Sequence, residues 1–159
     1  MVKFDTEFIE RMRDRMARYA KFDEKGDVSS RVAVSVTKRE NLRSETSPEN
    51  QDFSWISDEN GPSPLSYFIS SLGMCQMVHY AEHAASEGIN ITDLSIRVEG
   101  KFKVSRPREF TEIDYDVVIT SPDPIDTIRK LAFNSASDCY VTNTLSKACT
   151  TQAFSPWCP

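Results

Sequence analysis

The stretch GPSPLSYFISSLGMCQMVHYA, residues 61–81, contains no Asp, Glu, Lys or Arg in a chain in which these residues make up 27%. Ser63 can accept hydrogen bonds from the first amides of a helix and Pro64 fits a first turn, so we predict a long helix from there to about Glu87. Bulky apolar residues occupy every side of it, which is typical of a core or membrane helix. A membrane span needs about 20 predominantly apolar residues, whereas this helix contains several polar ones: Ser66, Ser70, Ser71, Gln76 and His79. We therefore predict a buried central helix, with Cys75 in its middle.

An apolar stripe follows this helix at three- and four-residue spacings and should face the interior: Leu65, Phe68, Ile69, Leu72, Cys75, Val78 and His79. Cys75 has two interpretations, a packing residue or a reactive thiol. The first is the commoner, because a free cysteine is among the most buried residue types. His79, one turn later, is able to exchange a hydrogen bond with the sulfur, although a lone histidine on an apolar stripe is more often a satisfied core residue.

The composition limits the range of functions. A chain of 159 residues fits one domain, since ~100–200 residues per domain is usual, and 39% hydrophobic content suffices for a core. The formal net charge of −5 argues against nucleic acid or a membrane surface as partner and favours small neutral ligands or proteins. Residues 1–16 carry charges of both signs and lack the apolar core of a secretory signal, so we expect a cytoplasmic protein.

Four cysteines are present, Cys75, Cys139, Cys149 and Cys158. In a reducing compartment cysteines are more often free, catalytic or metal-binding than structural disulfides. No CxxC pair occurs, which argues against a zinc site or a thioredoxin-like motif. Cys149 and Cys158 lack a metal-ligand spacing, and we assign them no role.

Residues 4–22 place apolar side chains at three- and four-residue spacings between charges of both signs, which predicts an amphipathic helix with a solvated charged face. We assign residues 1–26 to a helical extension and residues 27–159 to the main domain. Between residues 31 and 56, alternating apolar residues and an aromatic patch predict short strands, separated by the polar stretch of residues 43–51.

A β-hairpin is predicted after the central helix, from two runs that alternate every second residue around a turn at residues 105–108. The inward positions are Leu94, Ile96, Val98, Phe102 and Val104 in the first run, and Ile113, Tyr115, Val117 and Ile119 in the second. The outer face of the first run is basic at Lys101 and Lys103, whereas that of the second is acidic. Antiparallel pairing would place opposite charges together and fix the register.

Two further helices are predicted near the C-terminus. Asp123 should cap the first, which is short and buries Ile125, Ile128, Leu131 and Ala132. A new start signal at residues 135–137 predicts a second helix that ends near residue 148 and carries Cys139 in its first turn. Amide donors and the helix dipole would stabilise a thiolate there, so Cys139 is a plausible redox partner.

The runs GPSPLSYFISSLGMC and FNSASDCYVTNTLSKA together resemble the OsmC/Ohr family of thiol-dependent hydroperoxide reductases. In that family a proline-initiated helix carries the first cysteine eleven positions after the proline, as Pro64 and Cys75 do here, and the second cysteine opens a late helix, as Cys139 does. The likeness covers roughly residues 31–148. It implies an α+β fold in which antiparallel sheets wrap around the long central helices of an intertwined homodimer.

The resemblance further implies a two-cysteine peroxidase without cofactor or metal. Cys75 would attack an organic hydroperoxide and become a sulfenic acid, Cys139 would resolve it as a disulfide, and a dithiol or thioredoxin-like protein would reduce the disulfide.

One departure qualifies that expectation. Efficient family members carry a glutamate one or two positions after the proline, which holds an arginine beside the thiolate, whereas this chain has Leu65 and Ser66. No local motif selects the arginine among Arg31, Arg39 and Arg43. The expected activity is therefore weak peroxide reduction. The alternative is a catalytically silent dimer of the same fold that binds a small apolar ligand.

Overall fold

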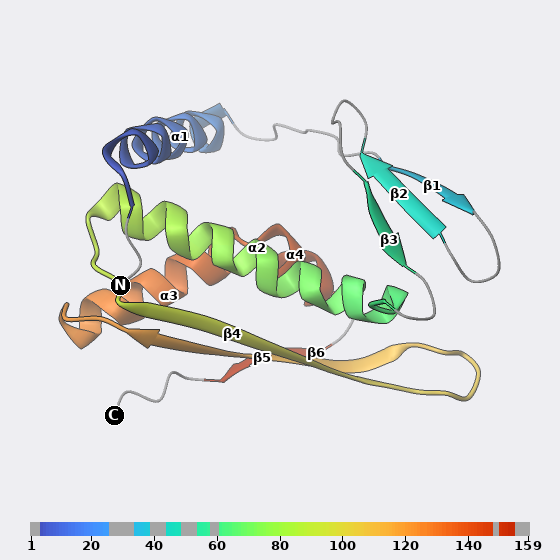
Figure 1. The fold of residues 1–159 in the computed structure, drawn as a ribbon. Helices are drawn as coiled ribbons and strands as arrows, with labels where there is room; N and C mark the ends of the chain where they lie inside the picture. The colour runs from blue at the N-terminus through green and yellow to red at the C-terminus, as the bar shows by residue number, and fades with distance from the viewer. Residues whose placement is uncertain are drawn as a thin grey trace. The chain divides into compact units, whose positions relative to one another are not determined.

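The computed structural model describes residues 4–25, 34–38, 44–48, 54–57, 61–147 and 150–154, which form helices α1 to α4 and strands β1 to β6 (Figure 1). The chain divides into two compact units, one of residues 1–21 and 69–159, the other of residues 22–68. The predicted boundary between residues 26 and 27 lies outside the described residues.

The smaller unit contains an antiparallel sheet in the order β1-β2-β3, formed by β1 (Val34–Lys38), β2 (Ser44–Pro48) and β3 (Trp55–Ser57). Strands were predicted in this region, but the polar stretch of residues 43–51 was expected to separate them and instead supplies the central strand. The prediction failed there because strand pairing joins backbone groups, and a polar sequence offers these as well as an apolar one.

Helix α2 (Pro64–Glu87) has the predicted bounds. The Ser66 amide donates to Ser63 Oγ over 3.1 Å, which satisfies one of the first orphan amides of the helix. At the other end Gly88 has a φ of 72°, and the Ile89 amide donates to the Ala84 carbonyl over 2.9 Å. Glycine adopts this left-handed conformation without strain, so the helix ends there in a Schellman motif.

In the larger unit β4 (Asp93–Phe102) and β5 (Phe110–Thr120) form the predicted antiparallel hairpin. Lys101 lies opposite Glu112, with Nζ 2.9 Å from the carboxylate, as the charge pattern predicts. The inward residues of β5 are buried and those of β4 are half-buried as far as Val98, whereas Phe102 and Val104 are exposed, because the register shifts after Lys101. Strand β6 (Thr150–Phe154), which was not predicted, pairs with β5 in parallel.

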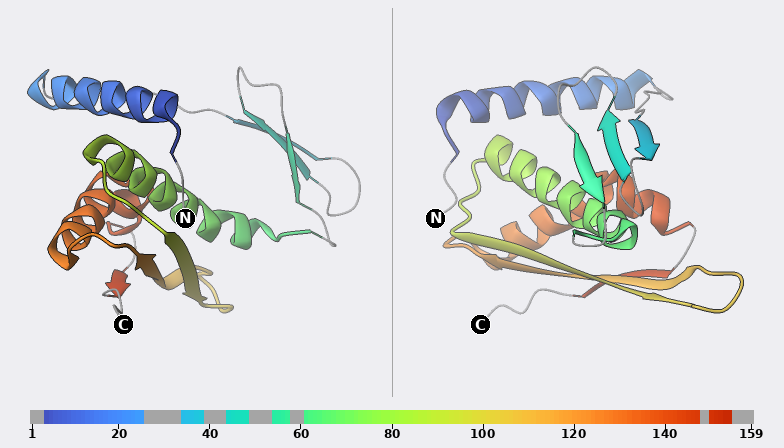
Figure 2. Two further views of the ribbon diagram at one scale, coloured as in Figure 1. Left: turned by 60° about the vertical axis from the view of Figure 1, so that its left-hand side comes forward. Right: turned by 45° about the vertical axis from the view of Figure 1, so that its right-hand side comes forward.

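Helices α2 and α3 (Ile125–Asp138) lie on one face of the β4-β5-β6 sheet (Figure 2). A Cβ atom at Gly73 would meet a methyl group of Val98 at 3.2 Å, so the absence of a side chain lets α2 approach the sheet closely. Helix α1 (Thr6–Lys25) crosses the opposite side of α2 with its residues up to 21 (Figure 1). No helix in the described part of the chain is both long and apolar enough to cross a membrane.

The C-terminal helices differ from the prediction in two respects. Asp123 does not cap α3; its carboxylate accepts from the Asn90 amide over 2.6 Å and so ties two loops together. Nor does a new helix start at residues 135–137, because Ser135 continues the buried stripe of Ile128 and Leu131 and α3 extends to Asp138. The last helix, α4, is Tyr140–Leu145, and residue 148, its expected end, lies outside the described residues.

The buried face of α2 also differs from the predicted stripe. Leu72 and His79 are buried as expected, but Cys75 is half-buried and Val78 is 48% exposed. Most of the remaining buried positions are polar or small: Gln76, Tyr80, Glu82, His83, Ala84 and Ala85. Apolarity alone did not identify this face, because the buried polar side chains have partners on α1, α3 and α4.

Candidate functional site

The two predicted cysteines lie together, although 64 positions separate them in sequence. Cys75 is half-buried in the middle of α2, and Cys139 is fully buried between α3 and α4, where its extended backbone ends one helix before the next begins. The two thiols lie close enough for Cys139 to contribute to the raised pKa of Cys75, and both are free. Cys139 is thus the N-cap of α4 and not a member of its first turn, and its sulfur accepts from the Thr142 amide over 3.4 Å.

Backbone amides of α4 also face the first thiol. The N–H groups of Val141 and, to a smaller extent, Tyr140 lie close enough to the Cys75 sulfur to act on its pKa. Burial is nevertheless the largest influence and raises the pKa of the Cys75 thiol above its ordinary value; the Val141 amide opposes this, and the hydrogen bond with Cys139 adds to it. In isolation Cys75 is therefore held as a thiol, and its ionisation needs a proton acceptor or alkaline pH.

A buried glutamine fixes α4 against α2. Gln76 follows Cys75 directly, and its side-chain amide donates to Thr142 Oγ1 over 2.7 Å. Its Nε2 also lies 3.5 Å from the Tyr115 hydroxyl on β5. Because Thr142 is the residue whose amide reaches Cys139, this contact holds the two cysteine-bearing segments in one relative position.

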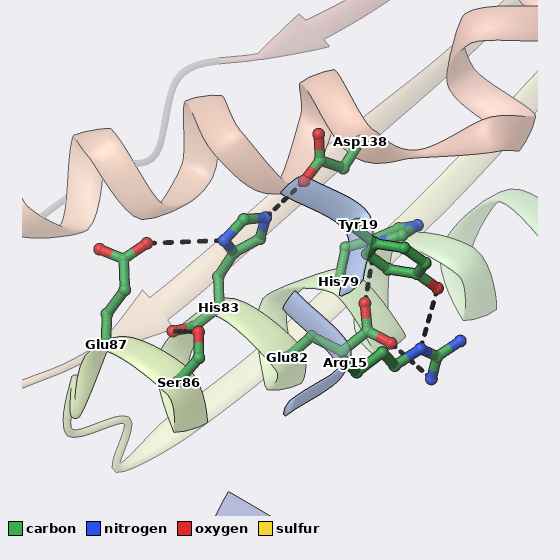
Figure 3. Close-up of polar contacts among 8 residues, drawn as sticks. All are labelled: Arg15, Tyr19, His79, Glu82, His83, Ser86, Glu87 and Asp138. Atoms are coloured by element: carbon green, nitrogen blue, oxygen red, sulfur yellow. Dashed lines mark hydrogen bonds and ion pairs between the residues drawn. The ribbon is translucent and has the colours of Figure 1, made fainter. Parts of the chain in front are cut away.

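A polar cluster occupies the next turns of α2 (Figure 3). Glu82 is 1% exposed, and its carboxylate lies 3.1 Å from His79 Nδ1 and 2.7 Å from a guanidinium nitrogen of Arg15 on α1. Arg15 is held in turn by the Tyr19 hydroxyl over 2.9 Å. The His79 ring packs against that of Tyr140, with 5.9 Å between centroids, so α1, α2 and α4 meet at this cluster.

A second buried histidine joins α2 to α3. His83 Nε2 lies 2.9 Å from a carboxylate oxygen of Asp138, and Nδ1 lies 3.5 Å from Glu87 (Figure 3). Lys130 on α3 adds a longer contact of 3.6 Å to Glu87. These contacts attach the end of α3 to α2.

Sequence reasoning missed the charged partners of this region. Arg15 was assigned to a solvated face of a helical extension, but it pairs with the buried Glu82. The signal available was Glu82 itself, the first charged residue of α2, three positions after His79. Leu65 and Ser66, which stand where the resemblance places a glutamate, carry no charge, and the three arginines considered for the same pair lie outside the described residues.

One cavity and one surface hollow lie elsewhere in the larger unit, and Cys75 lines neither. The cavity, of about 440 Å³, is mainly apolar, is partly open and lies between the start of α1, the end of α2 and the loop that follows α2. The hollow, of about 940 Å³, follows α1 and is bordered by side chains of that helix alone. Within the described residues, no group of three His, Cys, Asp or Glu side chains is arranged to hold a metal ion.

Solved structures with the same fold cover most of the chain. An OsmC-like protein from Mycoplasma pneumoniae superposes with a TM-score of 0.70 at 17% identity, over 81% of this chain and 99% of that one. An organic hydroperoxide resistance protein OsmC from Legionella pneumophila gives 0.59 at 10% identity, over 80% and 97%. The organic hydroperoxide resistance protein OhrB of Bacillus subtilis gives 0.55 at 12%, over 76% and 96%. At these identities the likeness shows the fold.

Sequence comparison identifies the family. No curated protein matches the chain. The family model described as OsmC-like protein matches residues 57–153, a range that begins and ends later than the predicted likeness over residues 31–148. Since the match spans more than half of the sequence and agrees with the fold, the chain belongs to the family of OsmC-like proteins.

Proposed function

We propose that this protein reduces organic hydroperoxides, with Cys75 as the attacking thiol and Cys139 as the resolving thiol. The proximity of the two free thiols, through which Cys139 influences the pKa of Cys75, is the observation that carries the proposal. The names of the structural neighbours from Legionella and Bacillus, both hydroperoxide resistance proteins, support the same substrate class.

The reaction proceeds in two steps. The Cys75 thiolate attacks the outer oxygen of the hydroperoxide, so that an S–O bond forms as the O–O bond breaks, and the alkoxide takes up a proton and leaves as the alcohol. The sulfur has then lost two electrons and is a sulfenic acid. Cys139 attacks this sulfur, water leaves and a disulfide forms, which an external dithiol or thioredoxin-like protein reduces. Free thiols fit a reducing compartment, so the cytoplasm is part of the proposal.

A homodimer is also part of the proposal. Met74, Met77 and Val78 lie on one side of the central helix and are 66%, 37% and 48% exposed in the single chain. Contiguous exposed apolar residues are typical of interaction sites. A second copy of α2 is the occupant that the apolar, uncharged character of this side favours.

Intact mass and peptide mapping test the mechanism. One equivalent of cumene hydroperoxide should make the reduced protein two hydrogens lighter and link Cys75 to Cys139. Cys75→Ser should abolish peroxide consumption, whereas Cys139→Ser should leave a sulfenic acid that dimedone traps. Cys149→Ser is the matched control, since no role is predicted for that thiol. Full consumption by the Cys75→Ser variant would refute the proposal.

The apolar cavity of about 440 Å³ supports a second candidate, a silent member of the fold that binds a small apolar ligand. Ligand pockets usually have volumes of roughly 300–1,000 Å³ and mainly apolar walls. Ala84 and Ile91 are among its walls, so Ala84→Trp should fill it. This candidate predicts saturable binding of an apolar fluorescent probe that the substitution removes, and thiols that cumene hydroperoxide leaves unchanged.

A further inference from the structure

The buried pair of Glu82 and His79 has no part in the reaction described so far. A carboxylate that is 1% exposed is costly unless it is paired, and Glu82 is paired on two sides, by His79 Nδ1 at 3.1 Å and by Arg15 at 2.7 Å. An ionised carboxylate only accepts hydrogen bonds. With Nδ1 of His79 3.1 Å from this carboxylate, the tautomer protonated at Nδ1 is the one that suits the pair, and it leaves Nε2 as the nitrogen able to accept a proton.

The helix places this histidine one turn after the first thiol. Cys75 and His79 are four residues apart on α2, so their side chains are neighbours on one face of the helix. Side chains on a helix lean toward its N-terminus, which is the direction of Cys75 from His79. Figure 3 shows a ring nitrogen of His79 on the side away from Glu82.

Tyr140 gives an independent indication that the two residues share one space. Its ring packs on the His79 ring, with 5.9 Å between centroids. Its backbone N–H lies close enough to the Cys75 sulfur to act on the pKa of that thiol. One residue of α4 thus packs on the histidine and lies near the thiol.

Cys75, His79 and Glu82 thus follow one another as a nucleophile, a base and a carboxylate that orients the base. We propose that His79 is the acid–base residue for Cys75, oriented through Nδ1 by the buried Glu82, with Arg15 holding that carboxylate in place. This proposal rests on the function proposed above and assigns its proton transfers.

The protons then balance within the site. Cys75 gives its thiol proton to Nε2 of His79, and the resulting thiolate attacks the peroxide. As the O–O bond breaks, the imidazolium returns that proton to the alkoxide, which leaves as the alcohol. The hydroxyl group on the sulfenic acid comes from the peroxide. Glu82 stays ionised throughout and is a positioning residue, as is Arg15.

Several titratable groups lie in the region of His79. They belong to three helices: Arg15 and Tyr19 on α1, Cys75 and Glu82 on α2, and Cys139 and Tyr140 at the start of α4. Burial and then the nearby Tyr19 raise the pKa of Tyr140 further above neutral pH.

The rate of Cys75 alkylation by iodoacetamide, followed by peptide mass spectrometry from pH 6 to 10, tests this inference. The unmodified protein should show a shoulder near neutral pH, where His79 holds the proton, below the main alkaline rise. His79→Gln should remove the shoulder and lower the rate at pH 7 about a hundredfold, the low end of acid–base contributions. The alkaline rate should not change, since hydroxide then removes the proton.

His83→Gln is the matched control, because it removes a buried histidine with a carboxylate partner from the same helix but leaves His79 in place. It should keep the shoulder. If His79→Gln lowered the alkylation rate by the same factor at every pH, the role of His79 would be purely structural and the inference would be overturned. A pH profile that does not change in this variant would overturn it as well.

A spectroscopic measurement tests the inference even if the His79→Gln variant does not fold. In the folded Cys75→Ser protein, the NMR titration of the His79 ring should shift relative to the unmodified protein, while that of His83 stays in place. An unmoved His79 titration overturns the inference. Alkylation reports on the thiol whether or not peroxide is consumed, so a normal shoulder without peroxide reduction would refute only the proposed function.

Discussion

The two sides of α2 differ from those of an ordinary amphipathic helix. Its buried side mixes apolar residues such as Leu72 with four polar ones, Gln76, His79, Glu82 and His83, whereas its exposed side carries the apolar Met74, Met77 and Val78. The buried polar residues have defined partners on α1, α3 and α4. The exposed apolar residues belong to the helix that carries the candidate thiol.

This difference shows how one helix serves two purposes. Buried hydrogen bonds and ion pairs add little net stability but specify which segments meet, because an unpaired buried polar group is costly. On this helix they bring Cys139 and Tyr140 to Cys75. The apolar side has no such directional requirement and suits association, which depends on the area removed from water.

The largest expected effect concerns the exposed side. If a second copy covers α2, replacing both Met74 and Met77 by Glu buries unpaired carboxylates at the interface. The dimer dissociation constant should rise by at least about a hundredfold, since each such group costs several kcal/mol. Sedimentation velocity measures it. Phe133→Glu, at a 72% exposed position on α3, is the control and should leave the association unchanged. A monomeric unmodified protein would contradict the prediction.

The next effect concerns the buried side. Glu82→Ala removes the partner of His79 and Arg15 and should lower the free energy of unfolding by about 3 kcal/mol, the low end for a broken buried pair, because the Arg15 side chain is 42% exposed. Urea unfolding measures the change. Glu82→Gln should cost less, since it keeps the volume of the side chain and a polar oxygen next to His79. Equal losses in both variants would contradict this and show that the negative charge of Glu82, and not its volume, matters at this position.

Much of the fold could be predicted because its signals are local. Ser63, Pro64 and Gly88 mark the ends of α2 through backbone conformation and capping, which neighbouring residues determine. The β4-β5 hairpin follows from a two-residue period, and the Lys101–Glu112 pair from its charges. Local signals failed where the secondary structure of a segment depends on the segment that it packs against. The polar β2 became a central strand because it pairs on both sides, and α3 continued past Ser135 because that side chain is buried.

The candidate site was predictable to a smaller extent. Family resemblance selected Cys75 and Cys139, but their contact depends on how α2 meets the segment between α3 and α4. The partnership of Arg15 with Glu82 joins two helices that are far apart in sequence. Glu82, the first charged residue of α2, indicates that a partner is needed, but neither local sequence identifies that partner as Arg15. A buried charge is identified only with its partner, because burial without pairing is unfavourable.

A smaller effect should follow from the glutamine next to the first thiol. Gln76→Leu removes the 2.7 Å hydrogen bond to Thr142 and should lower the free energy of unfolding by about 1 kcal/mol. The loss is moderate because the side-chain oxygen of Gln76 has no hydrogen-bond partner among the described residues, and leucine relieves that cost. Met74→Leu on the exposed side is the control. If Gln76→Leu lowered the free energy of unfolding as much as Glu82→Ala does, the substitution would have detached α4 from α2.

The smallest effect should come from an exposed ion pair. The hydrogen bond between Lys101 and Glu112 raises the pKa of the lysine and lowers the pKa of the glutamate. The pair therefore contributes at pH values above the ordinary pKa of glutamate and below that of lysine, and its contribution is lost as pH falls through the lowered pKa or rises through the raised one. Solvent and salt screen it, so Lys101→Met should leave the unfolding midpoint at pH 7 within experimental error. If Lys101→Met lowered the stability as much as Glu82→Ala does, then ion pairing itself, and not its burial, would account for the stabilisation by the Glu82 pair.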